Sequence, residues 1–130
     1  MNVPDSSGWI EYFANGPNAD RFAPVAVDAP TLLVPSIVLH EVFRWADREG
    51  GERAAQRAVA AMRAGLVIPL DADLAIAAAR LARRHRLPTA DSIIYATALA
   101  HRATVWTQDD DFADLANVRY FAKVKPESEV

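Results

Sequence analysis

The sequence predicts an α/β fold in which helices cover both faces of a parallel sheet. Short apolar runs bounded by proline or polar residues alternate with longer segments of helical periodicity along nearly the whole chain. Neither an internal repeat nor an interdomain linker interrupts this alternation. Parallel strands need crossover connections, and such crossovers are right-handed, so the topology is strongly restricted.

The predicted strands are short. The chain opens with a strand that ends at Asp5, and buried apolar runs follow at residues 31–34, 66–69 and 104–107. Residues 118–121 are a further candidate at an edge of the sheet. The sequence therefore predicts four to five strands joined by helical segments.

The predicted helices begin near residues whose side-chain oxygens can accept hydrogen bonds from the first backbone N–H groups. We expect helices at residues 7–13, 19–26, 37–49, 52–64, 72–85 and 90–101. Five of them have a candidate cap, namely Ser7, Asn18, Ser36, Asp71 and Thr89. Gly50 and Gly51 separate the third helix from the fourth, which predicts a helical hairpin or a bent arm.

Composition predicts one folded domain. A chain of 130 residues with 52% hydrophobic and 24% charged residues can bury a core and does not resemble a disordered protein. We assign residues 1–122 to the domain and residues 123–130 to a polar C-terminal tail. The absence of cysteine excludes disulfides and thiolate metal ligands. Without a leader or a membrane-length apolar run, we expect a cytoplasmic protein with no membrane partner.

The formal net charge of −3 does not decide between partners. It arises from 17 acidic and 14 basic residues, and setting four acids aside as metal ligands leaves 13 against 14, or +1. Binding of phosphate groups depends instead on where the arginines lie.

Four acidic residues form the candidate site. Asp5 follows the first strand and Asp109 follows the fourth, whereas Asp91 lies in the first turn of a helix. Glu41 lies in the second turn of the helix that follows strand two. The carboxyl ends of parallel strands meet at one edge of a sheet, where α/β proteins bind ligands. If strands one and four are neighbours, Asp5 and Asp109 face each other.

Carboxylates gathered within coordination distance repel one another and raise each other's pKa unless a cation lies between them. Oxygen ligands without cysteine or clustered histidine favour Mg²⁺ or Mn²⁺ over zinc. Such a site suits hydrolysis of phosphodiester bonds, because the metal activates water and offsets charge on the phosphate. The hypothesis is that the four acids hold this metal.

Each acid also has an ordinary structural explanation. Asp5 could accept hydrogen bonds from backbone N–H groups in a turn. Glu41 could pair with Arg44 on a helix surface. Asp91 could be favoured by the helix dipole alone.

Nearby polar residues admit two interpretations as well. Thr107 could hold a carboxylate or a metal-bound water, or it could be an ordinary strand residue. Ser6 and Ser7 admit the same alternatives. The three histidines have no metal-ligand spacing, and we assign them no chemistry.

Four short motifs follow one another along nearly the whole chain. They are Asp5-Ser6-Ser7 after the first strand, Glu41 in a helix after Ser36, Pro88-Thr89-Ala90-Asp91 opening a helix, and Thr107-x-Asp109-x-Asp111-Phe112. Together they resemble the PIN-domain ribonucleases. The chain length and the Asp5-Ser6-Ser7-Gly8-Trp9 opening are most similar to the VapC toxins of bacterial toxin–antitoxin pairs.

This resemblance implies a three-layer α/β/α sandwich with a central parallel sheet of four to five strands. It also implies a Mg²⁺ or Mn²⁺ cofactor, endonucleolytic cleavage of RNA, a homodimer, and a small cognate antitoxin as partner. By position, the resemblance makes the metal-binding catalytic carboxylates Asp5, Glu41, Asp91 and Asp109. The supporting residues are Thr107, Asp111 and Ser6.

One residue departs from the family pattern. Pro4 stands where the family usually has an apolar strand residue. Because proline donates no hydrogen bond to a strand ladder, we expect the first strand to end early and Asp5 to shift slightly.

Two surfaces are candidates for binding partners. The candidate RNA-binding residues, which could instead be an ordinary solvated face, are Arg80, Arg83, Arg84 and Arg86. A second arginine cluster surrounds the glycine pair, at positions 44, 48, 53 and 57. A candidate apolar groove for an antitoxin segment is formed by Ile10, Phe13, Phe22, Val42, Phe43 and Trp45.

Two other functions remain open. A catalytically inert PIN-like protein-binding module would keep the fold and bind a partner without cleaving RNA. A phospho-accepting receiver domain would share the size and the acids at a strand edge. It would need an acceptor aspartate at the end of strand three, where Pro69 and Leu70 precede Asp71.

Overall fold

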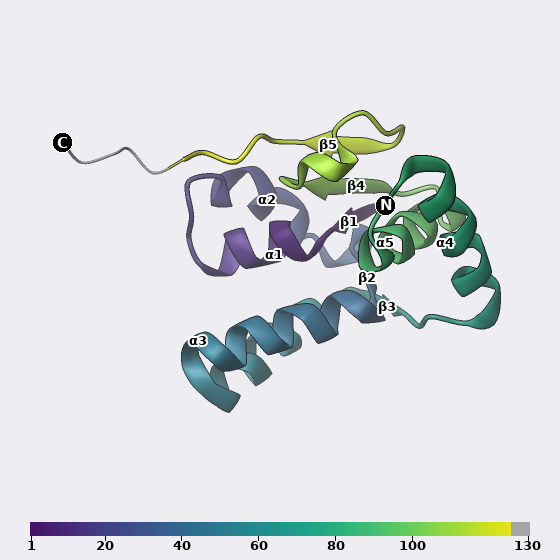
Figure 1. Cartoon of the computed structure of the whole chain (residues 1–130). Helices are drawn as coiled ribbons and strands as arrows, with labels where there is room; N and C mark the ends of the chain where they lie inside the picture. Colours follow the sequence, from purple (N-terminus) through teal and green to yellow (C-terminus); the bar gives the residue numbers. More distant parts are fainter. Residues whose placement is uncertain (126–130) are drawn as a thin grey trace.

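The computed structural model describes residues 1–125 and contains a parallel α/β arrangement, as the sequence predicts (Figure 1). The strands are β1 (Asn2–Pro4), β2 (Leu33–Pro35), β3 (Leu66–Ile68), β4 (Thr104–Thr107) and β5 (Val118–Tyr120). One sheet has the order β1-β4-β5, and β2 pairs with β3 in a second; every pairing is parallel. A parallel bridge between Asn2 and Leu32 connects the two sheets. The first and fourth strands are neighbours, so the condition for Asp5 and Asp109 to lie at the same edge of the sheet is met.

Helices lie on both sides of the strands. They are α1 (Ser6–Phe13), α2 (Ala19–Ala26), α3 (Ser36–Met62), α4 (Ala72–His85) and α5 (Thr89–Ala100). Two short 3₁₀ helices, η1 (Ala29–Thr31) and η2 (Asp110–Phe112), complete the elements. In Figure 1, α1 and α2 lie to one side of β1 and β4, and α4 and α5 lie to the other. This arrangement matches the predicted three-layer sandwich.

Helix α3 contains the predicted break. Gly51 has φ +82° and ψ 179°, which is outside the helical region and is readily adopted only by glycine. The chain turns there and returns beside itself as the arm at the lower edge of Figure 1. The two predicted helices are therefore one hairpin that extends away from the sheet.

The start of α1 differs from the prediction. Its N-cap is Asp5 rather than Ser7, and the Asp5 carboxylate accepts a hydrogen bond from the Gly8 backbone N–H at 2.9 Å. Asn18 occupies the N-cap position of α2, but its side chain makes no capping bond. In both cases the predicted capping side chain instead forms hydrogen bonds with a segment that is distant in sequence.

Two further caps were predicted one residue too late. Pro35 and Pro88 are the N-cap residues of α3 and α5, and neither helix has a side-chain cap. Ser36 and Thr89 therefore lie inside the first turn. The extended backbone of each proline (ψ 138° and 157°) lets the helix begin immediately after it.

The predicted early end of the first strand is confirmed, because β1 ends at Pro4 and not at Asp5, whereas the shift of Asp5 stays a prediction. Pro4 pairs with Trp106 in the β1–β4 register, and the Asp5 backbone N–H donates to the Trp106 carbonyl at 3.0 Å. Successive residues of a strand direct their N–H groups to opposite sides. The missing N–H of Pro4 thus faces away from β4, so the β1–β4 pairing is kept up to Pro4, and the Asp5 N–H adds one hydrogen bond to β4 beyond it.

The second strand also begins later than predicted. The sequence predicted residues 31–34, whereas β2 covers Leu33–Pro35 and follows the η1 helix. Pro30 lies in the first turn of that 3₁₀ helix, where its missing N–H costs nothing.

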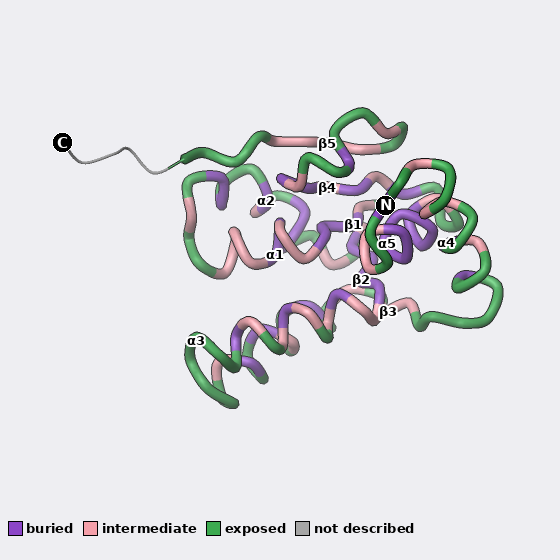
Figure 2. Tube along the Cα trace, in the orientation of Figure 1, coloured by how far each residue is buried: buried purple, intermediate pink, exposed green. Residues whose placement is uncertain are grey.

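The core lies between the strands and the helices that cover them. Figure 2 shows buried segments along β1, β2, β4 and α5, while the far turn of α3 is exposed. Two members of the predicted apolar groove, Phe22 and Val42, are fully buried and belong to this core, so their assignment to a docking surface is wrong. Within residues 1–125, no helix is both long and apolar enough to cross a membrane.

A groove remains where the rest of that apolar surface was predicted. Phe13 and Trp45 are half-buried, and they line a groove of 330 Å³ between α1 and the two helical arms of α3, which precede and follow Gly51. The predicted polar tail lies partly outside the described residues, at 126–130, and the domain boundary at residue 122 stays a prediction.

The cap of α4 provides a test of these local assignments. The Asp71 carboxylate accepts from the Leu74 backbone N–H at 2.8 Å, as predicted. We expect Asp71→Ala to lower the free energy of unfolding by about 1 kcal/mol, measured by chemical denaturation. Asp73→Ala, in the same first turn and without a capping bond in the structure, should cost only a few tenths of a kcal/mol. Equal losses would contradict the capping role.

Candidate functional site

Asp5 is buried at the carboxyl end of β1, where only 2% of the residue is exposed. Its Oδ1 atom accepts from the Ser7 hydroxyl at 2.7 Å and from the Gly8 N–H at 2.9 Å. Its Oδ2 atom accepts from the Thr107 hydroxyl at 2.6 Å. A carboxylate has about four acceptor positions, so these three donors leave one position on Oδ2 for a further ligand.

Two hydroxyl groups connect the ends of β1 and β4. The fully buried Thr107 hydroxyl donates to Asp5 and accepts from the Asp109 backbone N–H at 2.8 Å. The Ser7 hydroxyl donates to Asp5 and accepts from the Gln108 backbone N–H at 3.2 Å. Asp5 is therefore held in a fixed orientation relative to the residues that follow β4.

Three aspartates approach one another most closely. Asp91, Asp109 and Asp111 each offer one carboxylate oxygen, and these oxygens lie within 4.8 Å of one another. Asp109 accepts from the Asp111 backbone N–H at 2.9 Å, and this bond caps the η2 helix. Asp111 was predicted to be a supporting residue, whereas its carboxylate lies in the group of three whose oxygens approach one another most closely. The short η2 turn, which periodicity does not reveal, accounts for the difference.

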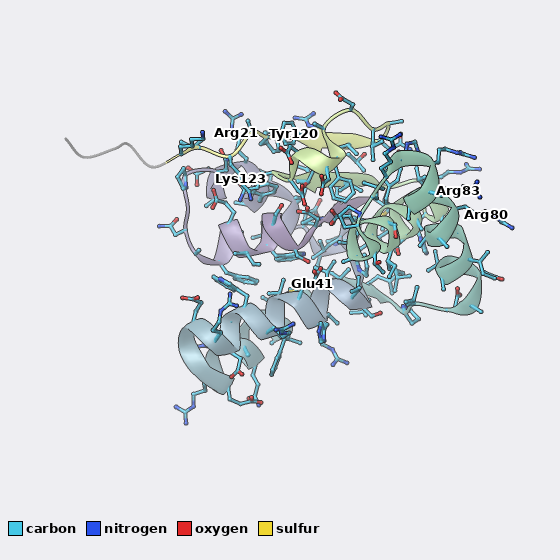
Figure 3. The ribbon with its side chains drawn as sticks, viewed as in Figure 1. Arg21, Glu41, Arg80, Arg83, Tyr120 and Lys123 are labelled. Carbon is cyan, nitrogen blue, oxygen red and sulfur yellow. The ribbon has the colours of Figure 1, made fainter. Side chains whose placement is uncertain are left out.

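Glu41 lies in α3 and points toward α1 (Figure 3). Its Oε1 atom accepts from the Ser6 hydroxyl at 2.6 Å. The alternative pairing with Arg44 is absent, because the ion pair found among residues 1–125 joins exposed Arg48 and Glu49. Ser6 thus orients Glu41, and Glu41 lies outside the group of three aspartates.

The acids act on one another through their charge. Burial and the neighbouring carboxylates raise the pKa of Asp91 to about 7, with burial the largest cause. Four acids add to this effect, in decreasing order Asp109, Asp5, Asp111 and Glu41. The four acids predicted from the sequence, together with Asp111, therefore lie close enough to influence a single carboxyl group.

The pKa of Asp5 is also raised, but by less than that of Asp91. Burial raises the pKa of Asp5 to about 6, even though hydrogen bonds from Thr107, Ser7 and Gly8 lower it. The charge of Asp109 raises it further. Opposing contributions of this kind are expected where a carboxylate is buried among fixed donors.

The arrangement fits a divalent cation bound by oxygen. Oxygens about 2.1 Å from a Mg²⁺ ion lie at most about 4.2 Å apart in octahedral geometry. The separations among Asp91, Asp109 and Asp111, at most 4.8 Å, are close to this range. Asp111 is exposed, so its side chain can adjust. A cation there would offset the repulsion that raises the pKa of Asp91.

The four candidate RNA-binding arginines are all exposed, at positions 80, 83, 84 and 86. Figure 3 shows Arg80 and Arg83 projecting outward from α4. Their role in RNA binding stays a prediction.

Asn18 and Gln108 make polar contacts near the acids that the sequence did not indicate. Asn18 is buried, and its Nδ2 atom donates to Gln108 Oε1 at 3.1 Å and to the Ala122 carbonyl at 3.0 Å. It thereby ties the end of β4 to the segment after β5. Asn18 lies 90 residues from Gln108 in sequence, so no local pattern could have indicated the contact.

Comparisons with known proteins agree with the observed fold. The family model described as PIN domain matches residues 3–118. A toxin–antitoxin complex from Klebsiella pneumoniae has a TM-score of 0.81 at 24% identity, covering 95% of this chain and 100% of the other. VapC20 from Mycobacterium tuberculosis, described as a sarcin–ricin loop cleaving toxin, has a TM-score of 0.76 at 22% identity, with coverage of 91% and 97%.

A third structure, FitAcB from Neisseria gonorrhoeae, has a TM-score of 0.69 at 21% identity, covering 91% of this chain and 96% of the other. At these identities the similarity establishes the fold. No curated protein sequence matches this chain significantly.

Removing the hydroxyl of Thr107 tests its support of Asp5. Thr107→Val should lower the free energy of unfolding by about 1–3 kcal/mol, because a buried carboxylate loses a donor. The pKa of Asp5, followed by NMR titration, should rise above about 6, since that hydrogen bond lowers it. Thr107→Ser keeps the hydroxyl and should behave like the wild type. An unchanged pKa in Thr107→Val would refute the proposed support.

The crowded acids should make the metal-free protein less stable as the pH rises. Asp5 and Asp91 have native pKa values of about 6 and 7, above the ordinary 3.8, so the folded state binds more protons than the unfolded state between about pH 4 and 7. Stability, measured as Tm in EDTA, should therefore fall across this range. Asp91→Asn should reduce the fall and raise the Tm at pH 8, whereas the exposed control Asp47→Asn should not. A Tm that rises from pH 4 to 7 through these groups would contradict this account.

Proposed function

This chain belongs to the PIN domain family, and from that membership we propose that it is a metal-dependent endoribonuclease, the toxin of a VapBC-type toxin–antitoxin pair. The observation that carries the proposal is the gathering of five carboxylates from four separate segments at the carboxyl ends of β1 and β4. Phosphodiester hydrolysis is a chemistry that such an oxygen-rich site suits.

The proposed catalytic carboxylates are Asp5, Glu41, Asp91 and Asp109, with Asp111 as an additional ligand. The close approach of Asp91, Asp109 and Asp111 supports direct binding of Mg²⁺ or Mn²⁺ by these three. Asp5 retains one acceptor position on Oδ2 for the same purpose. A bound divalent cation would supply an activated water and would offset negative charge on the phosphate.

The other residues prepare this site. Thr107 and Ser7 fix the orientation of Asp5, and Ser6 fixes that of Glu41. Because Asp5 and Asp91 have pKa values of about 6 and 7, both carboxyl groups hold a proton for part of the time below neutral pH. Cation binding therefore competes with protons, and it should strengthen as the pH rises to 7.

The groove between α1 and the arms of α3 is the proposed docking site for the antitoxin. Its apolar wall includes Phe13, Trp45 and Ala58, and charged Glu49 and Arg57 also line it. An amphipathic helix could place its apolar face against such a wall. The similarity to a solved toxin–antitoxin complex supports this partner. A homodimer stays a prediction.

The receiver-domain alternative is wrong. The chain matches the PIN domain model over residues 3–118, and Asp71 caps α4 instead of presenting an acceptor at the end of β3. The remaining alternative is a catalytically inert PIN-like module that binds a partner without cleaving RNA.

Activity measurements separate the two functions. Expression of the wild-type protein should arrest growth, and the purified protein should cleave RNA with Mg²⁺ or Mn²⁺ but not with EDTA. Asp5→Asn and Asp91→Asn should each reduce cleavage by more than the roughly 100-fold that loss of an outer ligand contact can cost. Asp47→Asn, an exposed change on α3, should retain activity.

Two results would end the nuclease proposal. One is equal growth arrest by the wild type and both site variants. The other is a wild-type protein that stays inert toward RNA with Mn²⁺ while binding its antitoxin tightly, which would establish the binding module.

A further inference from the structure

A second groove opens directly beside Asp109. It has a volume of 240 Å³ and is lined by Gln108, Asp109, Asp110, Tyr120, Ala122 and Lys123. Pockets for drug-sized ligands usually measure about 300–1,000 Å³, so this groove suits a smaller group. Because Asp109 belongs to both, the groove is continuous with the acidic site.

The walls of this groove are held in place. Asn18 donates one hydrogen bond to Gln108 Oε1 and another to the Ala122 carbonyl, so the segment after β5 is fixed against the end of β4. The Nε2 group of Gln108 makes no hydrogen bond within residues 1–125 and remains a donor for a ligand. A groove with walls fixed before binding loses little entropy when a ligand enters.

Tyr120 provides an aromatic surface beside the acids. It pairs in register with Thr107, so both side chains lie on the same face of the sheet, and Thr107 holds Asp5. Tyr120 is half-buried, and its hydroxyl makes no hydrogen bond in the part of the chain that the structure describes. The ring is therefore partly exposed, and it lines the groove.

The groove has one basic group, Lys123, among lining residues that also include the acids Asp109 and Asp110. Lys123 is exposed, and no ion pair within residues 1–125 involves it. Figure 3 shows Lys123 and Tyr120 in the same region as Arg21, remote from Arg80 and Arg83 on α4. Arg21 stacks over Phe121 at 5.5 Å, and Arg119 stacks over Trp106 at 5.0 Å. Arg119 and Trp106 precede Tyr120 and Thr107 in the register, so they lie on the opposite face of the sheet and outside this groove.

We propose that this groove binds one nucleotide of single-stranded RNA next to the phosphate that is cleaved. The base stacks on Tyr120, Lys123 contacts a backbone phosphate, and Gln108 Nε2 donates to the base. Stacking on aromatic side chains combined with basic groups is how proteins commonly hold single strands. This inference rests on the proposed nuclease function, since it assigns a substrate subsite to the same centre.

RNA binding in EDTA tests the subsite without cleavage. The probe is a single-stranded RNA of about ten nucleotides that contains the fluorescent base 2-aminopurine. Tyr120→Leu should weaken binding roughly 5- to 150-fold and should reduce quenching of the probe, whereas Tyr120→Phe keeps the ring and should match the wild type. Lys123→Gln should lower the slope of log affinity against log salt by about 0.7. Lys125→Gln is the matched control and should leave the slope unchanged, because Lys125 does not line the groove.

The outcomes separate this inference from the nuclease proposal. If the wild type cleaves RNA with Mn²⁺ but Tyr120→Leu and Lys123→Gln bind the probe normally, the subsite is overturned and the nuclease stands. If the wild type binds the probe through Tyr120 but does not cleave RNA, the subsite stands and the nuclease proposal fails. Unchanged RNA binding with loss of the antitoxin complex would assign the groove to a protein partner and overturn the subsite. Thermal unfolding of each variant verifies that it is folded.

Discussion

Repulsion among carboxylates is the constraint on which the rest of this structure depends. Burial raises the pKa of Asp91, and the charges of four neighbouring acids add to the effect, so that this pKa reaches about 7. A fold that gathers like charges loses stability unless protons or a cation offset them. A cation bound by these acids would offset their mutual repulsion. The paired strands and the hydroxyl groups of Thr107 and Ser7 hold these acids in position.

The hydrogen bonds around Asp5 fix the position of the acidic site. Thr107 and Ser7 each form hydrogen bonds with both Asp5 and the segment after β4. The carboxyl ends of the first and fourth strands are therefore connected to each other. Asn18 connects the segment after β4 to the segment after β5 through its hydrogen bonds to Gln108 and Ala122. The same hydrogen bonds therefore support the acidic site and the groove beside it, whereas the apolar groove along α3 lies at the other end of α1, next to Phe13. This separation allows an RNA and a protein partner to occupy different surfaces.

Much of this arrangement was accessible from the sequence because it depends on local signals. Alternating apolar runs and helical periodicity predicted the parallel α/β fold, and the glycine pair predicted the turn in α3, where Gly51 adopts a positive φ. Acids at the ends of β1 and β4 pointed to one edge of the sheet. The caps were less predictable, because a serine near a helix start can bond the helix or a distant partner. Ser7 bonds Asp5 and Gln108, and Asn18 bonds Gln108 and Ala122.

The sequence by itself determined the order of the elements, the chemical type of the site and the acids available to it, since these depend on composition and spacing. Only the tertiary structure decided which oxygens approach one another. It brought Asp111 into the closest group through the η2 turn and left Glu41 oriented by Ser6. It also placed Phe22 in the core and Tyr120 beside Thr107. Such contacts join residues up to about a hundred positions apart, and they follow from strand register and packing, which no local pattern encodes.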